Sequence, residues 1–364
     1  MRGPRGAVVG ASVGGALAVG VVVLLAATFG AVAVAVAAVL ALVPLGALTL
    51  TVRWVDRWEP EPRSALLFAL AWGAGVAVLV ALVLNTASSV ALVVSGLDET
   101  SAAALTASVV APVVEESVKG LGVLVVFWCW RRHVDGPVDG IVYAATVATG
   151  FAVVEDVLYL AHAFEGGGAE VAAVFALRAL FSPFAHLMFT APVGLAVGVA
   201  ARRGEASWLW RAPLGWLLAV ALHALWNGSA TLGGGELFLA LYVLVQVPLF
   251  VGAVVLVLWL RRQEGRAVAE ALAPFAAHGW FTAADLQMLS SMSARSRALQ
   301  WARGVGGPAG EAALREFQEA ATALAYQRHR VLHRRVGTEG LVDEQVLAAR
   351  AARARGRVRD LLAV

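Results

Sequence analysis

Eight apolar segments occupy most of the first 260 residues of this chain, and each is long enough to cross a membrane. A membrane-spanning helix needs about 20 predominantly apolar residues. Of the 364 residues, 60% are hydrophobic and the mean hydropathy is +0.78, which excludes a soluble protein. The sequence therefore predicts an all-α fold, a polytopic membrane helix bundle with about eight transmembrane helices. The predicted spans cover approximately residues 7–28, 31–52, 64–85, 102–129, 138–162, 179–201, 213–231 and 236–260.

The C-terminal residues have a different composition. Residues 263–364 carry Ala, Leu, Arg and Glu at helical spacing, which predicts a small helical cytoplasmic segment. We accordingly expect two domains, a transmembrane domain over residues 1–262 and a cytoplasmic helical tail over residues 263–364. The basic charge of the tail favours attraction to anionic lipid. No nucleic-acid-binding motif accompanies this charge, so we do not expect the tail to bind nucleic acid. The tail could instead bind a partner protein, which the sequence does not identify.

Arginines occur in alternate loops between the predicted spans, whereas the opposite loops contain the stretches 96–99, 165–168 and 233–236, which have neither Arg nor Lys. Short cytoplasmic loops carry an excess of Arg and Lys, so both termini are predicted to be cytoplasmic. The preference for Ala, Val, Gly and Arg, with a single Lys, is typical of a GC-rich bacterial gene. We therefore expect a multi-pass protein of the bacterial plasma membrane. The loop arginines are Arg53, Arg57, Arg63, Arg131, Arg132, Arg202, Arg203, Arg211, Arg261 and Arg262.

Four predicted spans carry ionisable side chains at a depth where few others occur. Each charged side chain at the bilayer centre costs about 2.5–3.5 kcal/mol on insertion scales, so such residues are usually functional. At a rise of about 1.5 Å per residue, the four spans can direct these side chains into one region of the outer half of the bilayer. The polar residues are Glu115, Glu116 and Lys119 in the fourth span, Glu155 and Asp156 in the fifth, His186 in the sixth, and His223 and Asn227 in the seventh.

These side chains suit hydrolysis of a peptide bond in two ways, which their spacing does not separate. In the first, a buried glutamate activates water as a general base while imidazole and amide donors hold the oxyanion. In the second, two His and one Glu hold a catalytic zinc ion and another Glu is the base. A Ser or Cys nucleophile is disfavoured, because no Gly-x-Ser-x-Gly elbow exists and Cys129 lies near the cytoplasmic end of its span. The alternative function is a proton-coupled membrane transporter, since intramembrane Glu, His and Lys also build proton relays.

Several motifs resemble those of the PrsW-type intramembrane proteases, relatives of the CAAX-prenyl protease superfamily. The resemblance covers about residues 50–232. It implies an intramembrane endopeptidase that cleaves a membrane-tethered protein, such as an anti-sigma factor, near the extracytoplasmic side. Metalloprotease is the usual description of the family. The motifs are Glu115-Glu116-x-x-Lys119, Phe151-x-x-x-Glu155, His186 and His223, together with the segments Asp56–Pro62, Asp139–Tyr143 and Pro183–His186.

The resemblance also implies roles for single residues. Glu115 is implied as the general base, and His223 with Asn227 as the donors to the oxyanion. CAAX-type relatives have His where this chain has Glu155, and family members often have Asn where it has Asp156. Our expected catalytic set is Glu115, Glu116, Glu155, His186, His223 and Asn227, with Lys119 and Asp156 in support, and with Glu155, His186 and His223 as ligands if zinc binds.

Overall fold

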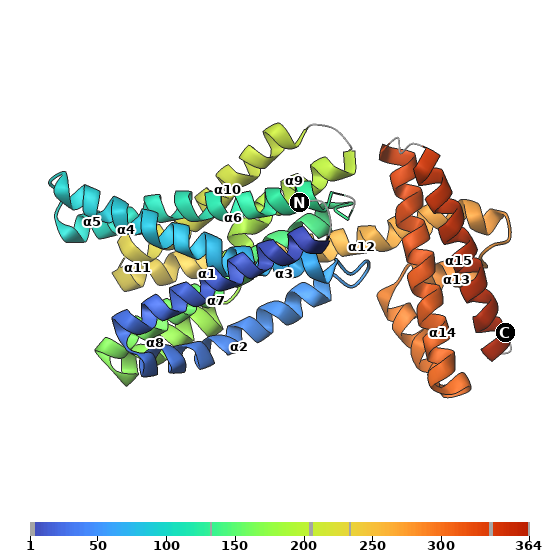
Figure 1. Cartoon of the computed structure of the whole chain (residues 1–364), viewed down its shortest axis with the longest axis horizontal. Helices are drawn as coiled ribbons and strands as arrows, with labels where there is room; N and C mark the ends of the chain where they lie inside the picture. Colours follow the sequence, from blue (N-terminus) through green and yellow to red (C-terminus); the bar gives the residue numbers. More distant parts are fainter. Residues whose placement is uncertain (1–3, 132, 204–206, 233, 335–337, 363–364) are drawn as a thin grey trace. The chain divides into compact units, whose positions relative to one another are not determined.

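The chain is helical throughout the part that the structure describes. The computed structural model describes residues 4–131, 133–203, 207–232, 234–334 and 338–362, and these ranges contain no strand (Figure 1). The predicted all-α class is confirmed. The chain forms two compact units, one of residues 1–56, 61–201 and 205–255, and one of residues 57–60, 202–204 and 256–364.

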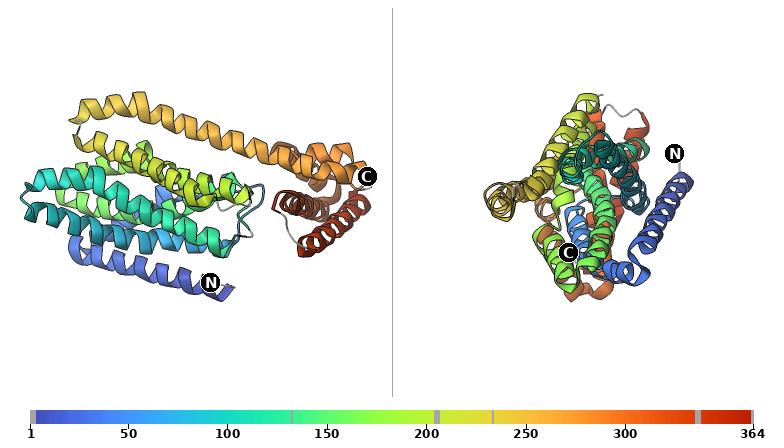
Figure 2. Two further views of the ribbon diagram at one scale, coloured as in Figure 1. Left: turned by 90° about the horizontal axis from the view of Figure 1, so that it is seen from above. Right: turned by 90° about the vertical axis from the view of Figure 1, so that its left-hand side faces the viewer.

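The first unit is a bundle of long helices that run lengthwise beside one another (Figure 2). Several of them are continuous runs in which a short π-helical stretch (η) joins two α-helical parts. The elements are α1 (Pro4–Phe29), α2 (Ala31–Val55), α3 (Arg63–Ala71), η1 (Trp72–Ala77), α4 (Val78–Val94), α5 (Glu99–Leu105), η2 (Thr106–Val110), α6 (Ala111–Cys129), α7 (Pro137–Ala163), the 3₁₀ turn η3 (Phe164–Gly166), α8 (Gly168–Phe175), η4 (Ala176–Phe181), α9 (Ala185–Arg203), α10 (Trp208–Leu232), α11 (Gly234–Leu241), η5 (Tyr242–Gln246) and α12 (Val247–Ala277).

Seven helical runs among the described residues are long and apolar enough to cross a membrane. The segment predicted at residues 102–129 is also helical, within a run from Glu99 to Cys129. It carries three ionisable residues within five positions, Glu115, Glu116 and Lys119, and is not among the seven. The seven runs are Gly6–Phe29, Ala31–Val55, Arg63–Val94, Pro137–Gly166, Gly168–Arg202, Trp208–Thr231 and Gly235–Ala277.

A break in the helical run Gly168–Arg202 positions one of the candidate site residues. The π-helical segment η4 ends at Phe181, and Ser182 leaves the helix with φ −134° and ψ 29°. Ser182 precedes Pro183, and a residue before proline is disfavoured in the α conformation. Helix α9 therefore restarts at Ala185, which places His186 in its first turn. Irregular backbone at membrane depth is tolerated where it is buried in protein or lines a cavity.

Helix α7 occupies the centre of the first unit, and glycines let its neighbours approach closely. A Cβ atom at Gly140 of α7 would lie 2.0 Å from the carbonyl oxygen of Gly194 in α9, and one at Gly73 of η1 would lie 1.9 Å from that of Val147. Real Cβ atoms are never this close to backbone oxygens, so only glycine permits these helix contacts. In the most apolar 18-residue stretch of the span Pro137–Gly166, 83% of the stretch is buried inside the protein. The packing thus fixes the helix that carries Glu155 and Asp156.

We expect Gly140→Ala to destabilise the protein by about 1–3 kcal/mol, because the added methyl group would force α7 and α9 apart. Thermal unfolding of the purified protein in detergent measures this effect. Gly46→Ala is the matched control, since nothing lies within 4 Å of a Cβ at Gly46 of α2. Equal midpoints of thermal unfolding for the two variants would contradict the close contact between α7 and α9 at Gly140.

The second unit is formed by the end of α12, from Leu256 onward, with α13 (Ala283–Leu289), α14 (Met292–Arg334) and α15 (Thr338–Leu362). Helices α14 and α15 lie side by side (Figure 1), and α14 is kinked at Gly307, whose φ is +62°. Trp58, from the segment after α2, is 6% exposed and packs into the core of this unit with Leu272, Leu289 and other apolar residues. The unit therefore includes a residue from far outside the C-terminal sequence.

Candidate active site

The polar residues singled out from the sequence meet in the first unit, around a cavity of about 380 Å³. Helices α6, α7, α9 and α10 supply them, as the four predicted spans suggested. Glu116 and Lys119 lie behind the cavity wall and are fully buried. The residues of the set that line the cavity are Glu115, Glu155, Asp156, His186, His223 and Asn227.

Lys119 connects three of these groups. Its Nζ atom lies 2.8 Å from Glu116 Oε1, 3.3 Å from Glu115 Oε2 and 3.1 Å from His186 Nδ1. An ammonium group can only donate hydrogen bonds, so His186 Nδ1 accepts one from it. The ring proton of a neutral His186 is then on Nε2, which donates to Glu155 Oε2 at 2.7 Å. Both ring nitrogens of His186 are thereby engaged.

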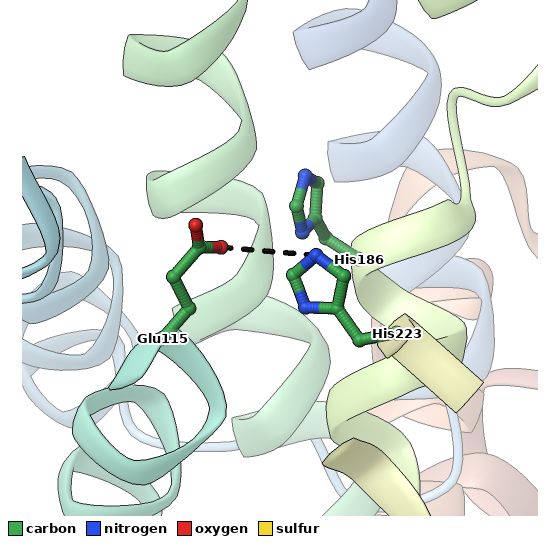
Figure 3. Close-up of side chains that lie close together, drawn as sticks. All are labelled: Glu115, His186 and His223. Atoms are coloured by element: carbon green, nitrogen blue, oxygen red, sulfur yellow. Dashed lines mark ion pairs between the residues drawn. The ribbon is translucent and has the colours of Figure 1, made fainter. Parts of the chain in front are cut away.

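Glu116 orients His223. Glu116 Oε1 lies 3.0 Å from His223 Nδ1, and Glu116 Oε2 accepts a hydrogen bond from the Thr190 hydroxyl at 2.8 Å. Because a carboxylate accepts, His223 donates from Nδ1, and the Nε2 atom of the neutral ring carries a lone pair. This Nε2 atom faces Glu115 Oε2 across 3.9 Å (Figure 3). Two hydrogen-bond acceptors that face each other in a buried site call for a donor or a cation between them.

Three side chains are close enough to bind one metal ion. A ligand atom from each of Glu115, His186 and His223 lies within 4.8 Å of the other two, and all three residues are buried (Figure 3). The predicted ligand set has Glu155 with the same two histidines, and in the structure Glu155 pairs with Arg178 and with His186 Nε2. Two His and one carboxylate form a common catalytic zinc site with an open position.

Arg178 belongs to the site and was not recognised from the sequence. It lies in η4 and forms ion pairs with both Glu155 and Asp156, while its guanidinium lies 4.5 Å from the centre of the Tyr159 ring. The predicted start of the sixth span at residue 179 excluded Arg178 from the membrane region. Its position on the side of the membrane that otherwise lacks Arg and Lys was the signal that could have identified it.

Asn227 is held at the edge of the cavity. Its Nδ2 atom donates to the carbonyl oxygen of Ala107 in η2, at 2.9 Å. Asn85 of α4, which the sequence did not suggest, also lines the cavity, and its Nδ2 atom lies 3.4 Å from Glu115 Oε1. The Asn85 Oδ1 atom is buried and has no hydrogen-bond partner among the described residues. A residue of the cavity wall thus carries a buried acceptor atom that no described residue satisfies.

Comparison with known proteins places this cavity in a family context. Residues 61–253 match the PrsW family of intramembrane metalloproteases, and every site residue above lies in this range. Over 175 residues the chain is 30% identical to Protease PrsW of Geobacillus kaustophilus (strain HTA426). That alignment covers 47% of this chain and 69% of the relative. No solved structure matches the chain.

Proposed function

Because the chain belongs to the PrsW family of intramembrane metalloproteases, it is a multi-pass membrane protease, and we propose that it cleaves a membrane-tethered protein near the extracytoplasmic side of the bacterial cell membrane. The observation that carries this proposal is the buried cavity in which Glu115 faces His223 Nε2. The arginine-rich loops support cytoplasmic termini, which would set the cavity in the outer half of the bilayer. A membrane-tethered anti-sigma factor is the substrate class that we propose.

Peptide hydrolysis needs a group that takes a proton from water. Glu115 is placed for this role, since it lines the cavity with Oε2 turned towards His223. Glu116 is placed for support, because both of its oxygens are occupied by Lys119, His223 and Thr190. We propose that Glu115 contacts the reacting water and that Glu116 holds His223 in the required tautomer.

The tautomer of His223 determines whether this residue can donate a hydrogen bond to the oxyanion. A neutral His223 that donates from Nδ1 cannot donate from Nε2, so it would hold water or metal there. Asn227, Asn85 and the Lys119 ammonium are the other donors near the site. We propose that an amide on the cavity wall, rather than a neutral His223, stabilises the tetrahedral oxyanion.

The residues fit a divalent metal, with zinc as our proposal. His223 donates its Nδ1 proton to a carboxylate, which is the usual arrangement of a metal-bound histidine. If ionised, Glu115, Glu116, Glu155 and Asp156 exceed the charge of Lys119 and Arg178 by two, which a divalent cation would balance. When bound, zinc would activate a water and polarise the scissile carbonyl. Glu115, His186 and His223 would hold it, and Glu115 would then be a metal ligand instead of the free base of the metal-independent route.

The proposed activity is tested with purified protein reconstituted in liposomes beside single-span reporter proteins, including a membrane-tethered anti-sigma factor. We expect the wild type to cleave at the outer end of a reporter span and His223→Ala to lose this activity, with mass spectrometry mapping the cut. Leu217→Ala is the control, since Leu217 is 54% exposed on α10 and lies away from the cavity. Equal cleavage by wild type and His223→Ala would overturn the assignment of the site.

Metal content provides a separate test. We expect purified wild type to contain about one divalent metal ion per chain by elemental analysis, and His223→Ala and Glu115→Gln to contain much less. Glu155→Ala should retain more metal than either, since Glu155 is not in the converging donor group. Wild-type protein that is active without any bound metal would leave Glu115 as a general base acting alone.

The transporter alternative is not favoured. The family match covers the whole polar set and describes proteases. Substrate uptake by liposomes that depends on pH, with no reporter cleavage, would favour the transporter.

A further inference from the structure

A second cavity of about 250 Å³ lies beside the site cavity, in the first unit of the fold. We name it the aromatic groove. Its wall contains Phe181, Phe184, Met188, Trp226, Tyr242 and Phe250. Phe181 is 60% exposed and Phe250 is 39% exposed, so the groove opens on the surface of the bundle that faces lipid.

The aromatic groove is continuous with the site cavity. Ser182, Pro183, Ala185 and Trp226 line both. Ser182 and Pro183 belong to the break before α9, and Ala185 is the first residue of α9, next to His186 in the chain. A molecule that lies in the groove can therefore extend past the break to the site residues.

One buried polar atom in the groove has no partner. Gln246, 4% exposed, donates from Nε2 to Ser229 Oγ at 2.8 Å, and Ser229 donates to the Trp226 carbonyl oxygen at 2.7 Å. These bonds fix the amide and leave Gln246 Oε1 without a hydrogen-bond partner among the described residues. Gln246 lines the groove, and its unpartnered oxygen suits a ligand that displaces the atoms covering it and donates a hydrogen bond.

The backbone around the groove is irregular on two sides. The π-helical segments η4 and η5 both contribute to its wall, and the Tyr242 hydroxyl donates to the Phe181 carbonyl oxygen at 2.9 Å across it. π-helical turns are rare and occur frequently at functional sites. Regular α-helix is therefore interrupted on both sides of the groove, beside the break that positions His186.

A peptide that is cleaved inside a membrane requires both an apolar site and a hydrogen-bond acceptor, and the groove offers both. Its helix must unwind at the scissile bond, and unwound N–H groups in hydrocarbon require acceptors from the protein. Its apolar side chains need an apolar site. We propose that the aromatic groove binds a large apolar side chain of the substrate close to the scissile bond, and that Gln246 Oε1 accepts an N–H from the same unwound segment. This inference rests on the proposed protease function and names the substrate feature that the enzyme selects.

The first test measures selectivity with a cleaved single-span reporter in which the residues around the mapped cut are varied among Ala, Leu and Phe. We expect wild type to prefer Leu or Phe at one position about tenfold or more over Ala. Phe250→Ala should reduce this ratio to near one, because cleavage of the Leu and Phe reporters should fall more than cleavage of the Ala reporter. Gln246→Met, which keeps the length but lacks the acceptor, should lower kcat/KM about tenfold for all reporters.

Val243→Ala is the matched control, because Val243 lies in η5, is 53% exposed and does not line the groove. It should behave as wild type. Cleavage that continues with an unchanged ratio in Phe250→Ala would overturn the groove assignment while the protease function stands.

The second test does not require cleavage. In a Glu115→Gln, Cys129→Ser background, Met188→Cys should form a disulfide cross-link with a reporter cysteine placed at the selected position. Leu218→Cys, on the exposed face of α10, should not. A Met188→Cys protein without this cross-link, or one that retains a lipid in the groove by native mass spectrometry, would overturn the inference. If the wild-type protein cleaved none of the reporters, the proposed protease function itself would be refuted.

Discussion

Replacing Glu115 with glutamine is expected to reduce the initial rate of reporter cleavage by about 10²–10⁴-fold, the contribution of a positioned general base. Glutamine preserves the size of the side chain but cannot take a proton from water. Glu115 lines the cavity, and its Oε2 atom faces His223 Nε2 across 3.9 Å. Rates are measured in liposomes and normalised to the folded fraction found by size-exclusion chromatography.

Glu116→Gln is the matched comparison, since it makes the same change at the next residue. Glu116 does not line the cavity, and a glutamine oxygen can still accept the Nδ1 proton of His223. We therefore expect a smaller reduction, about tenfold. If Glu116→Gln abolished cleavage while Glu115→Gln retained it, the two roles would have to be exchanged.

The second large effect is expected on stability, from Lys119→Met. The Lys119 ammonium is fully buried and pairs with Glu116 and Glu115 at 2.8 and 3.3 Å. Removing one partner of a buried ion pair leaves an uncompensated charge and costs about 3–5 kcal/mol. Unfolding in mixtures of mild detergent and dodecyl sulfate, followed by the fluorescence of the 12 tryptophans, measures the loss.

A double-mutant cycle separates the ion pair from simple loss of packing. Adding Glu116→Gln to Lys119→Met removes the charge that was left unpaired, so the double variant should be more stable than Lys119→Met alone. Strictly additive losses would show that the charge of Glu116 is not what Lys119 stabilises.

The sequence predicted the architecture well because long apolar segments have few alternatives in a membrane. Every predicted span is helical in the structure, apart from the break at residues 182–184 in the sixth span. The bounds of the sixth span were less accurate, because the helical run begins at Gly168 and not at residue 179. The π-helical stretches and the break at Ser182 arise from packing and from Pro183, and apolar periodicity does not report either. The burial of Trp58 in the second unit depends on contacts distant in sequence.

For the site, most of the residues could be identified from the sequence, but their hydrogen-bond and ion-pair partners could not. The free-energy cost of charged side chains in a membrane identified Glu115, His186 and His223 among the candidates, and the structure brings ligand atoms of these three within 4.8 Å of one another. Spacing along one helix could not show that Glu116, not Glu115, contacts His223 Nδ1. It also could not show that Arg178, from a segment taken as a loop, neutralises Glu155 and Asp156. These pairings join different helices, so only the tertiary fold determines them.

The burial of Lys119 has a practical consequence. Lys119 is the only lysine of the chain and is 0% exposed, so apart from the N-terminus it provides the sole primary amine. An amine-reactive reagent should therefore label this position only when the bundle opens and the ammonium loses its partners. The rate of this labelling, measured by mass spectrometry, therefore reports how often the bundle opens and requires no engineered probe.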